Sequence, residues 1–316
     1  MNLNFSNQVG IVIGDFMLDE YLYTKFIKDS PECNAPVVGI NQSNHFAGGA
    51  GNVVMNLNAL GVKVIPVGCV GDDKNGKKLL DIFRSNDINT NYIHCSSNVS
   101  TTHKKRLYVD NIQKIRIDSD SKYSNLKNIH SSILKNLSKL IQPCNFLILS
   151  DYNKSLITKD FSQRVISVCN DLDIPVIVDP KKESLEYYQG ASTITPNEKE
   201  AKLLYNSESI EHLISFFQKE IVRLNIENVL FKVGKDGMIV ITKDYIKKIK
   251  GIDVKDPDVT GAGDTVISIF SIMLSLNNCL IDCATVANIG ASLVVAKEET
   301  STVSYSELSS TIKKLI

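Results

Sequence analysis

Residues 145–179, NFLILSDYNKSLITKDFSQRVISVCNDLDIPVIVD, decide the fold class of this 316-residue chain. The apolar runs at 145–150 and 174–179 predict two buried strands, and the stretch at 158–171 between them predicts a helix. A helix between two strands of these lengths forms a βαβ unit, in which the two strands run parallel. The segment therefore predicts an α/β protein whose sheet is covered by helices.

The same alternation continues on both sides of this segment. Further strands are expected at 9–14, 62–70, 192–195 and 228–233, the last with a hairpin partner at 237–242. Further helices are expected between the glycines at 51 and 61, and at 75–86, 127–141, 197–205, 208–224, 261–276, 280–297 and 305–315. We expect one domain over residues 1–316, with a mostly parallel central sheet flanked by helices on both faces.

Two β-rich segments, at about 20–45 and 101–118, interrupt this alternation. The first reads as short β-like pieces broken by Pro31 and Pro36, and the second as strands with interspersed cations. Together they predict a small sheet that lies over the active site as a lid. Because the edges of such a sheet can be covered by another subunit, we expect a homodimer formed through the lid.

Composition excludes several classes of protein. Lys and Arg together number 35, as do Asp and Glu, so the net charge of zero gives no indication of a nucleic-acid partner. The apolar runs are too short to cross a bilayer, and the start MNLNFSNQVG does not resemble a secretory signal. The seven cysteines include one close pair, Cys279 and Cys283, which are four residues apart. We expect reduced thiols there rather than a metal site. We expect a cytoplasmic protein without a membrane partner.

The turn DVTGAGDT at 258–265 precedes an apolar helix and predicts an anion site. Thr260 is placed to cap the helix, which leaves the amides of Gly261, Ala262 and Gly263 free at its first turn. These small residues let a phosphate approach, and the helix dipole adds positive charge there. No Gly-Lys-Ser/Thr follows, so the turn is not a Walker A loop. A glycine-rich turn with a purely structural role is the alternative.

Asp264 lies within the same turn. Its carboxylate can face a hydroxyl that is held beside the phosphate, and it is the candidate general base that accepts the hydroxyl proton during phosphoryl transfer.

Two motifs in the expected order resemble those of one enzyme family. DVTGAGDT at 258–265 resembles the C-terminal signature of the ribokinase-like (PfkB) sugar kinases, and GGAGN at 48–52, with GCVGDD at 68–73, resembles their N-terminal signature. The resemblance spans essentially the whole chain. It implies a ribokinase-like fold and an ATP-dependent kinase that uses Mg²⁺, with a monovalent cation as a further candidate.

The resemblance places sugar-binding residues at the other motif. Asp15, after the first strand, corresponds to the family's carboxylate for sugar hydroxyls, and a carboxylate there points into the crevice where open α/β sheets bind ligands. An aspartate that caps a turn is the alternative. Gly48 and Gly49 would let the backbone approach the sugar, and Asn52 offers a donor and an acceptor for its hydroxyls.

Several shorter pieces are similar to one subfamily, the kinases of D-glycero-D-manno-heptose 7-phosphate. They are GDFMLD at 14–19, SPE at 30–32, PVV at 36–38, LSDYNK at 149–154 (which contains Asp151), VDPK at 178–181 and TSTV at 300–303. This likeness implies phosphorylation of the anomeric C1 hydroxyl to give a 1,7-bisphosphate for ADP-heptose and lipopolysaccharide core synthesis. The bifunctional form carries a nucleotidyltransferase domain, and this chain would be the kinase alone.

A substrate that already carries a phosphate requires cations at its far end. The candidates are Lys104, Arg106 and Arg116 from the expected lid, and Lys154 and Lys181 after two strands. Each has a solvated surface charge as its alternative. Lys28-Asp29 and Asp110 depart from the subfamily pattern. Two other readings stay open: a ribokinase-like kinase of ribose, fructose, a nucleoside or a vitamin, and a non-catalytic sugar-binding regulator of the same fold.

The nucleotide end is also implied by the resemblance. Asn197 and Glu200 correspond to the pair that organises Mg²⁺ through water, and a helix cap is their structural alternative. The remaining candidates for nucleotide contact are Lys232, Gly234, Gly237, Thr260 and Asn288. For Asn288, simple helix packing is the alternative.

Overall fold

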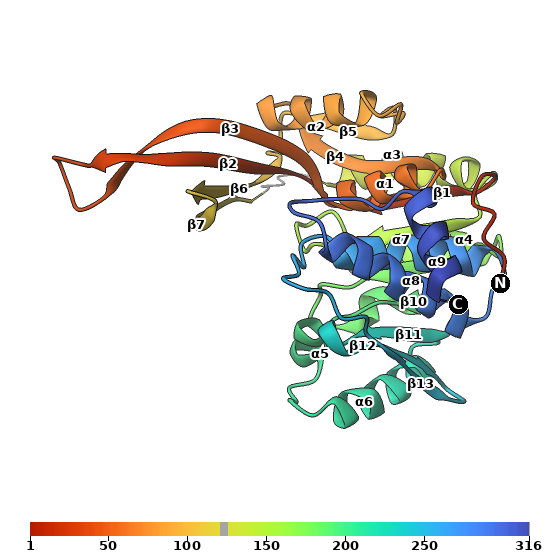
Figure 1. Cartoon of the computed structure of the whole chain (residues 1–316). Helices are drawn as coiled ribbons and strands as arrows, with labels where there is room; N and C mark the ends of the chain where they lie inside the picture. Colours follow the sequence, from red (N-terminus) through yellow and green to blue (C-terminus); the bar gives the residue numbers. More distant parts are fainter. Residues whose placement is uncertain (121–125, 316) are drawn as a thin grey trace.

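The computed structural model describes residues 1–120 and 126–315. Its main element is a nine-stranded sheet in the order β13-β12-β11-β10-β9-β8-β1-β4-β5 (Figure 1). The strands are β1 (Val9–Gly14), β4 (Lys63–Gly71), β5 (Ile93–Ser96), β8 (Phe146–Ser150), β9 (Val176–Asp179), β10 (Thr193–Ile194), β11 (Asn228–Lys232), β12 (Gly237–Thr242) and β13 (Ile246–Lys250). From β5 to β11 in this order all pairs are parallel, whereas β12 and β13 are antiparallel additions at one edge.

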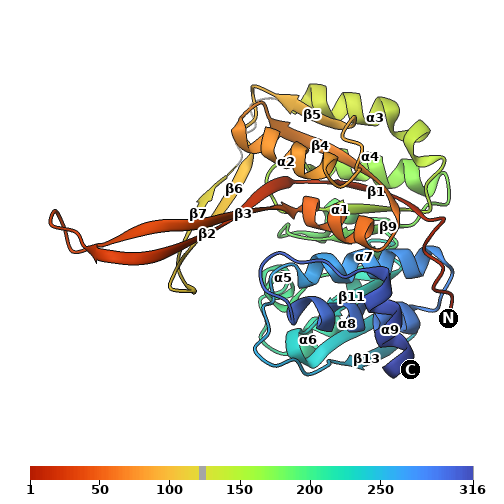
Figure 2. The same cartoon turned by 45° about the horizontal axis from the view of Figure 1, so that its top comes forward.

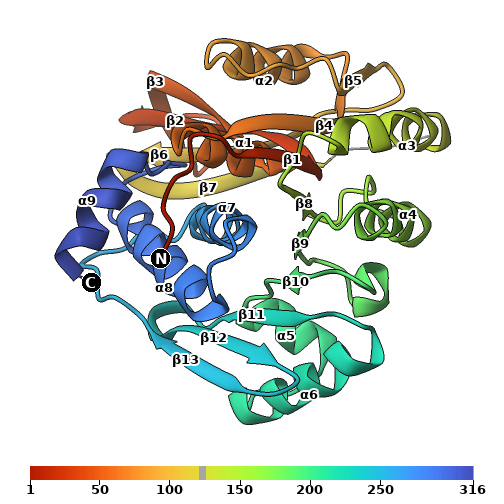
Figure 3. The same cartoon turned by 90° about the vertical axis from the view of Figure 1, so that its right-hand side faces the viewer.

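Helices cover both faces of this sheet, as Figure 3 shows. On one face lie α1 (Ala50–Ala59), α2 (Lys74–Arg84), α7 (Ala262–Ser275), α8 (Leu280–Val295) and α9 (Tyr305–Leu315). On the other lie α3 (Lys127–Ile141), α4 (Lys159–Asn170), α5 (Glu198–Leu204) and α6 (Ile210–Arg223). Each layer buries its own apolar cluster against the sheet. The central strands are apolar on both sides for this reason, as the sequences VGIVIG and FLILS show.

A second, four-stranded sheet stands apart from the main one. It has the order β3-β2-β6-β7 and consists of β2 (Phe16–Asp29), β3 (Pro36–Gly49), β6 (Thr102–Val109) and β7 (Ile112–Ser119). Strands β2 and β3 form a long ribbon that projects from the body of the molecule (Figures 1 and 2). The ribbon leaves β1 through Asp15 and returns directly into α1.

The predicted α/β architecture is therefore confirmed: a mostly parallel sheet with helices on both faces and a smaller sheet beside it. The short β-like pieces expected over 20–45 are wrong in detail, because β2 and β3 are continuous strands of 14 residues. Pro36 begins β3, where its missing amide hydrogen costs no ladder bond, and Pro31 lies in the connection. Strands β5 and β13 were not predicted. No helix in the described ranges is both long and apolar enough to span a membrane.

This topology gathers polar residues at one edge of the main sheet. Because parallel strands end at the same side, the residues that follow β1 and β8 and the last residues of β9 and β11 meet there. They include Asp15, Tyr152, Asp179 and Lys232. The first turn of α7 faces the same edge, since Asn52 at the start of α1 bonds to Asp264.

Candidate active site

The glycine turn at the start of α7 is formed by Gly261 rather than by Thr260. Gly261 is the residue that precedes the helix, with a left-handed φ of 78° that glycine tolerates best. The predicted cap by Thr260 is wrong: its amide donates to Asp258 Oδ1 at 2.9 Å, and within the described residues no side chain caps the helix. The Ala262 amide donates to the backbone oxygen of Val259 at 3.3 Å, so the amides of Gly261 and Gly263 are the candidate donors for an anion at this helix start.

Asp264 is buried in this first turn and is held at both oxygens. The Tyr152 hydroxyl donates to Oδ1 at 2.7 Å, and Asn52 Nδ2 donates to Oδ2 at 2.8 Å. Burial raises the pKa of Asp264 to about 6, against the lowering effect of these hydrogen bonds. A carboxylate that titrates near neutral pH suits a general base.

Asn52 belongs to a chain of amides behind this carboxylate. Its Oδ1 accepts from Asn56 Nδ2 at 3.3 Å, and Asn56 in turn accepts from the Thr265 hydroxyl at 2.9 Å. Asn52, which was predicted to bind the sugar, therefore holds the Asp264 carboxylate in this structure. A cavity of about 570 Å³ between α1, α2 and residues 297–302 has Asn52 in its wall.

Gly48 and Gly49 allow the ribbon to close tightly at its base. A Cβ on Gly48 would lie 2.3 Å from Asp19 Oδ2, and one on Gly49 would lie 2.7 Å from the backbone oxygen of Asp15. Gly49 also has a φ of 58°. Close packing thus favours glycine at both positions, and the approach of their backbone to a sugar stays a prediction.

Asp15 is buried and organises the loop after β8. Its Oδ2 accepts from the amides of Tyr152 and Lys154 at 3.0 Å each, and its Oδ1 accepts from the amide of Leu156 at 3.3 Å. Burial raises the pKa of Asp15, although the three amides oppose this. In this structure Asp15 caps the loop after β8, which was the alternative to a sugar-binding role. It does so at the edge of the sheet where a sugar was expected to bind.

A buried cluster of charges lies beside the glycine turn. Lys232 Nζ donates to Asp179 Oδ1 at 2.7 Å and lies 3.3 Å from where a Cβ of Gly263 would stand. Lys181 contacts Asp179 at 3.3 Å and also Glu200. Burial alone would raise the pKa of Asp179, but the two lysines lower it. Two cations therefore reach the anion site with their charges partly balanced.

Asn197 and Glu200 form a capping box at the start of α5. Asn197 Oδ1 accepts from the Glu200 amide at 3.0 Å, and Glu200 Oε2 accepts from the Asn197 amide at 2.8 Å. In the described residues no cluster of three or more carboxylate, histidine or cysteine side chains could ligate a metal. Mg²⁺ commonly binds through one or two carboxylates, waters and phosphates, so this pair fits an outer-shell role.

The cations that were predicted to bind the substrate phosphate have different surroundings in the structure. Lys104 lies 5.4 Å from the centre of the Tyr152 ring and thus faces the main sheet, whereas Arg106 pairs at 2.9 Å with Asp19 of the neighbouring strand β2. Arg116 on the outer strand β7 is paired with Asp118 on the same strand, and its side chain is 53% exposed. Lys154, after β8, pairs with Asp120 at 2.5 Å.

Other predicted residues have structural partners. Asp151 accepts from the Tyr188 hydroxyl at 2.7 Å and is fully buried, and burial raises its pKa to about 6. Asn288 donates to the backbone oxygen of Lys250 at 2.8 Å. A Cβ on Gly237 would lie 2.2 Å from a backbone oxygen of β13, whereas a Cβ on Gly234 would meet open space. Of these, Gly234 is the one with room for a ligand.

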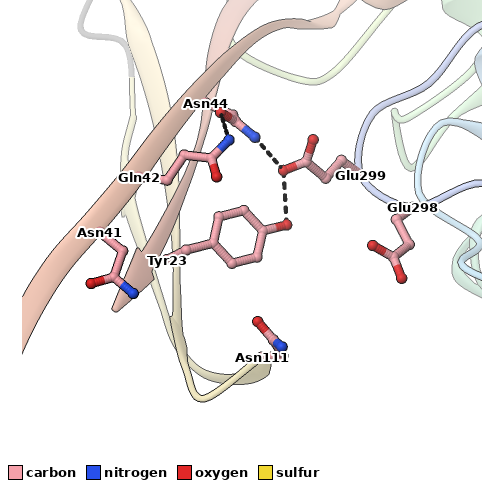
Figure 4. Close-up of a pocket in the computed structure, with 7 residues that line it drawn as sticks. All are labelled: Tyr23, Asn41, Gln42, Asn44, Asn111, Glu298 and Glu299. Atoms are coloured by element: carbon pink, nitrogen blue, oxygen red, sulfur yellow. Dashed lines mark hydrogen bonds between the residues drawn. The ribbon is translucent and has the colours of Figure 1, made fainter. Parts of the chain in front are cut away.

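The second sheet is also hydrogen-bonded to the loop after α8. Glu299 accepts from the Tyr23 hydroxyl at 2.8 Å and from Asn44 Nδ2 at 2.9 Å (Figure 4). A cavity of about 380 Å³ adjoins these contacts and is lined by Tyr23, Asn41, Gln42, Asn44, Asn111, Glu298 and Glu299. Its acidic wall is unsuited to a phosphate. The contacts tie the ribbon to the body beyond its base, as far out as the middle of β2.

Tyr152 and Asp179 were not among the predicted site residues. Both lie in motifs already noted, LSDYNK and VDPK, directly after or at the end of a strand. Their position at the carboxyl edge was therefore available from the sequence, but their partners were not.

The sequence and the fold are both similar to those of known proteins. The pfkB family carbohydrate kinase model matches residues 11–307. The chain is 37% identical over 303 residues to the bifunctional protein HldE of Sulfurimonas denitrificans, covering 94% of this chain and 63% of that protein's length. The fold matches Arabidopsis thaliana ribokinase complexed with ribose and ATP, with a TM-score of 0.76, 18% identity and coverage of 97% of this chain and 99% of that one. It also matches Escherichia coli phosphofructokinase-2 in complex with fructose-6-phosphate, with a TM-score of 0.79, 17% identity and coverage of 98% and 99%. The chain belongs to the pfkB family of carbohydrate kinases, which are phosphotransferases with an alcohol group as acceptor.

Proposed function

We propose that this chain transfers the γ-phosphoryl group of ATP to a hydroxyl of a sugar phosphate, with Asp264 as general base. The observation that carries the proposal is the position of Asp264 in the first turn of α7, directly after the glycine turn and with its pKa raised by burial. The acceptor hydroxyl gives its proton to the Asp264 carboxylate as its oxygen bonds to the γ-phosphorus. The bond from that phosphorus to the bridging oxygen breaks, and ADP leaves.

The transferred group would bind at the glycine turn Gly261–Gly263, where the amides of Gly261 and Gly263 and the ammonium of Lys232 are the candidate donors. Amides at a helix start and a lysine 3.3 Å from the Cβ position of Gly263 stabilise charge that shifts during transfer. Gly234 leaves space after β11 for the nucleotide. Asn197 and Glu200 would hold Mg²⁺ through its waters, and the ion neutralises the phosphate oxygens of ATP when bound.

For the acceptor, we propose D-glycero-D-manno-heptose 7-phosphate, phosphorylated at its anomeric hydroxyl. The likeness of LSDYNK, VDPK and TSTV to heptose phosphate kinases supports this, as does the 37% identity to an HldE protein. Lys104 reaches from the second sheet to Tyr152, after β8 of the main sheet, and Arg106 lies two residues further along the same strand; both would meet the 7-phosphate. The second sheet would then act as the lid over this substrate.

A substrate panel tests the proposal directly. ADP formation is measured with heptose 7-phosphate, unphosphorylated ribose, fructose and a nucleoside at equal concentration, with ATP and Mg²⁺. We expect turnover with the heptose phosphate to exceed the others. Robust turnover of ribose or fructose with none of the heptose phosphate would overturn this acceptor, and no turnover of any member would favour a sugar-binding regulator.

We also propose that two copies of the chain pair through the second sheet. Its outer strand β7 exposes Ile112, Ile115 and Ile117 at 51–59%, and within residues 1–120 and 126–315 it is an edge strand, paired on one side to β6. Light scattering at micromolar concentration should give twice the chain mass, and Ile117→Glu should shift it toward the monomer. A monomeric mass for the parent would contradict the pairing.

A further inference from the structure

Tyr152 is bonded to two aspartates of the candidate site at the same time. Its backbone amide donates to Asp15 Oδ2 at 3.0 Å, and its hydroxyl donates to Asp264 Oδ1 at 2.7 Å. These carboxylates come from the end of β1 and the start of α7, which are far apart in sequence. Tyr152 therefore joins the strand side of the site to the helix that carries the base.

Two cations fix the ring of Tyr152 in this position. The ammonium groups of Lys104, from the second sheet, and Lys181, after β9, each lie 5.4 Å from the ring centre. Cations at this distance are attracted to an aromatic face. The phenol thus has its backbone, its ring and its hydroxyl all held, so it can direct a hydrogen bond to one chosen oxygen of Asp264.

We propose that Tyr152 is a positioning residue that keeps the Asp264 carboxylate ionised and oriented for proton abstraction. This inference rests on the proposed role of Asp264 as the base. A hydrogen bond donated to a carboxylate favours its charged form, and the partner bond from Asn52 holds the other oxygen. Each carboxylate oxygen keeps a second lone pair, with which the acceptor hydroxyl can interact.

The other charges near Asp264 do not replace this hydrogen bond. Asp179 acts to raise the pKa of Asp264 and Lys181 acts to lower it, and the two are themselves paired at 3.3 Å. Lys232 is paired with Asp179 at 2.7 Å. Because these neighbours largely compensate one another, the donors that act directly on the carboxylate are Tyr152 and Asn52.

The test is Tyr152→Phe, which removes the hydroxyl and keeps the ring. The kcat/KM of the best acceptor is measured from about pH 5.5 to about pH 8.5 for the parent, for Tyr152→Phe and for the matched control Tyr92→Phe. Tyr92 is exposed and precedes β5. We expect the acid limb of Tyr152→Phe to move up by about one pH unit, so that its deficit grows about fivefold between pH 8 and pH 6. The control profile should match the parent.

A second measurement does not depend on the acceptor. The carboxyl of Asp264 is titrated by carbon-13 NMR, with its signal assigned by its loss in Asp264→Asn. We expect the pKa of Asp264 in Tyr152→Phe to exceed that of the parent. An unchanged pKa, a deficit that does not vary with pH, or a change in acceptor KM alone would overturn the inference. If Asp264→Asn stayed fully active, the proposed base would fail instead.

Discussion

Lys232 and Arg116 show how differently cations are used at the two sheets. Lys232, at the end of β11, is 11% exposed and paired with buried Asp179, beside the glycine turn. Arg116, on β7, is 53% exposed and paired with Asp118 of its own strand. The cation at the edge of the main sheet is thus buried in a fixed ion pair, whereas the cation on the outer strand of the second sheet is half-exposed. Preorganised donors contribute more to catalysis than solvated ones.

The largest effect is expected when the proposed base, at the edge of the main sheet, is removed. Asp264→Asn keeps the hydrogen-bonding shape but cannot accept the proton, so we expect the transfer rate to fall by roughly 10²–10⁴-fold. ATP and acceptor should still bind, as calorimetry would show. A variant as active as the parent would mean that another group is the base.

The next largest effect is expected at Lys232. Lys232→Gln removes a cation beside the transferred phosphoryl group and should lower kcat by about 10²-fold, the usual effect of losing one preorganised donor. Lys235→Gln, in the exposed turn that follows, is the matched control and should leave kcat unchanged. Equal effects of the two changes would show that only general charge matters.

Substitution of Arg106 and of Arg116 tests whether the buried and the exposed cations of the second sheet differ in function. Arg106 is 12% exposed, bonded to Asp19 and 5.0 Å from the Tyr21 ring. Arg106→Gln should raise the KM of a phosphorylated acceptor by about tenfold, since one charged contact is lost. Arg116→Gln should leave that KM unaltered. The reverse order would place the acceptor phosphate at the outer strand.

The smallest expected effect is that of pH on the parent protein. Because burial raises the pKa of Asp264 to about 6 and the base must be deprotonated, kcat/KM should halve near pH 6 and fall further below it. A profile that stays flat to about pH 4, the ordinary range of an aspartate, would contradict the buried setting of this carboxylate.

Much of the fold follows from local patterns in the sequence. The apolar runs and helical stretches from 127 onward predicted their elements to within a few residues, because buried parallel strands and amphipathic helices have distinct periodicities. The continuous strands β2 and β3 were missed, since their outer parts are exposed and lack an apolar pattern. Strand β13, IKKIK, is likewise mostly exposed.

The glycine turn, its aspartate and the family could be identified from the sequence alone. The side chains that complete the site could be identified only from the folded structure. Tyr152 and Asp264 are separated by 112 residues, and Asn52 and Asp264 by 212. Lys232 meets Gly263 because β11 ends at the edge where α7 begins. Local sequence patterns cannot predict such contacts, because the residues are far apart in the chain. They come together only when the helices pack on the sheet.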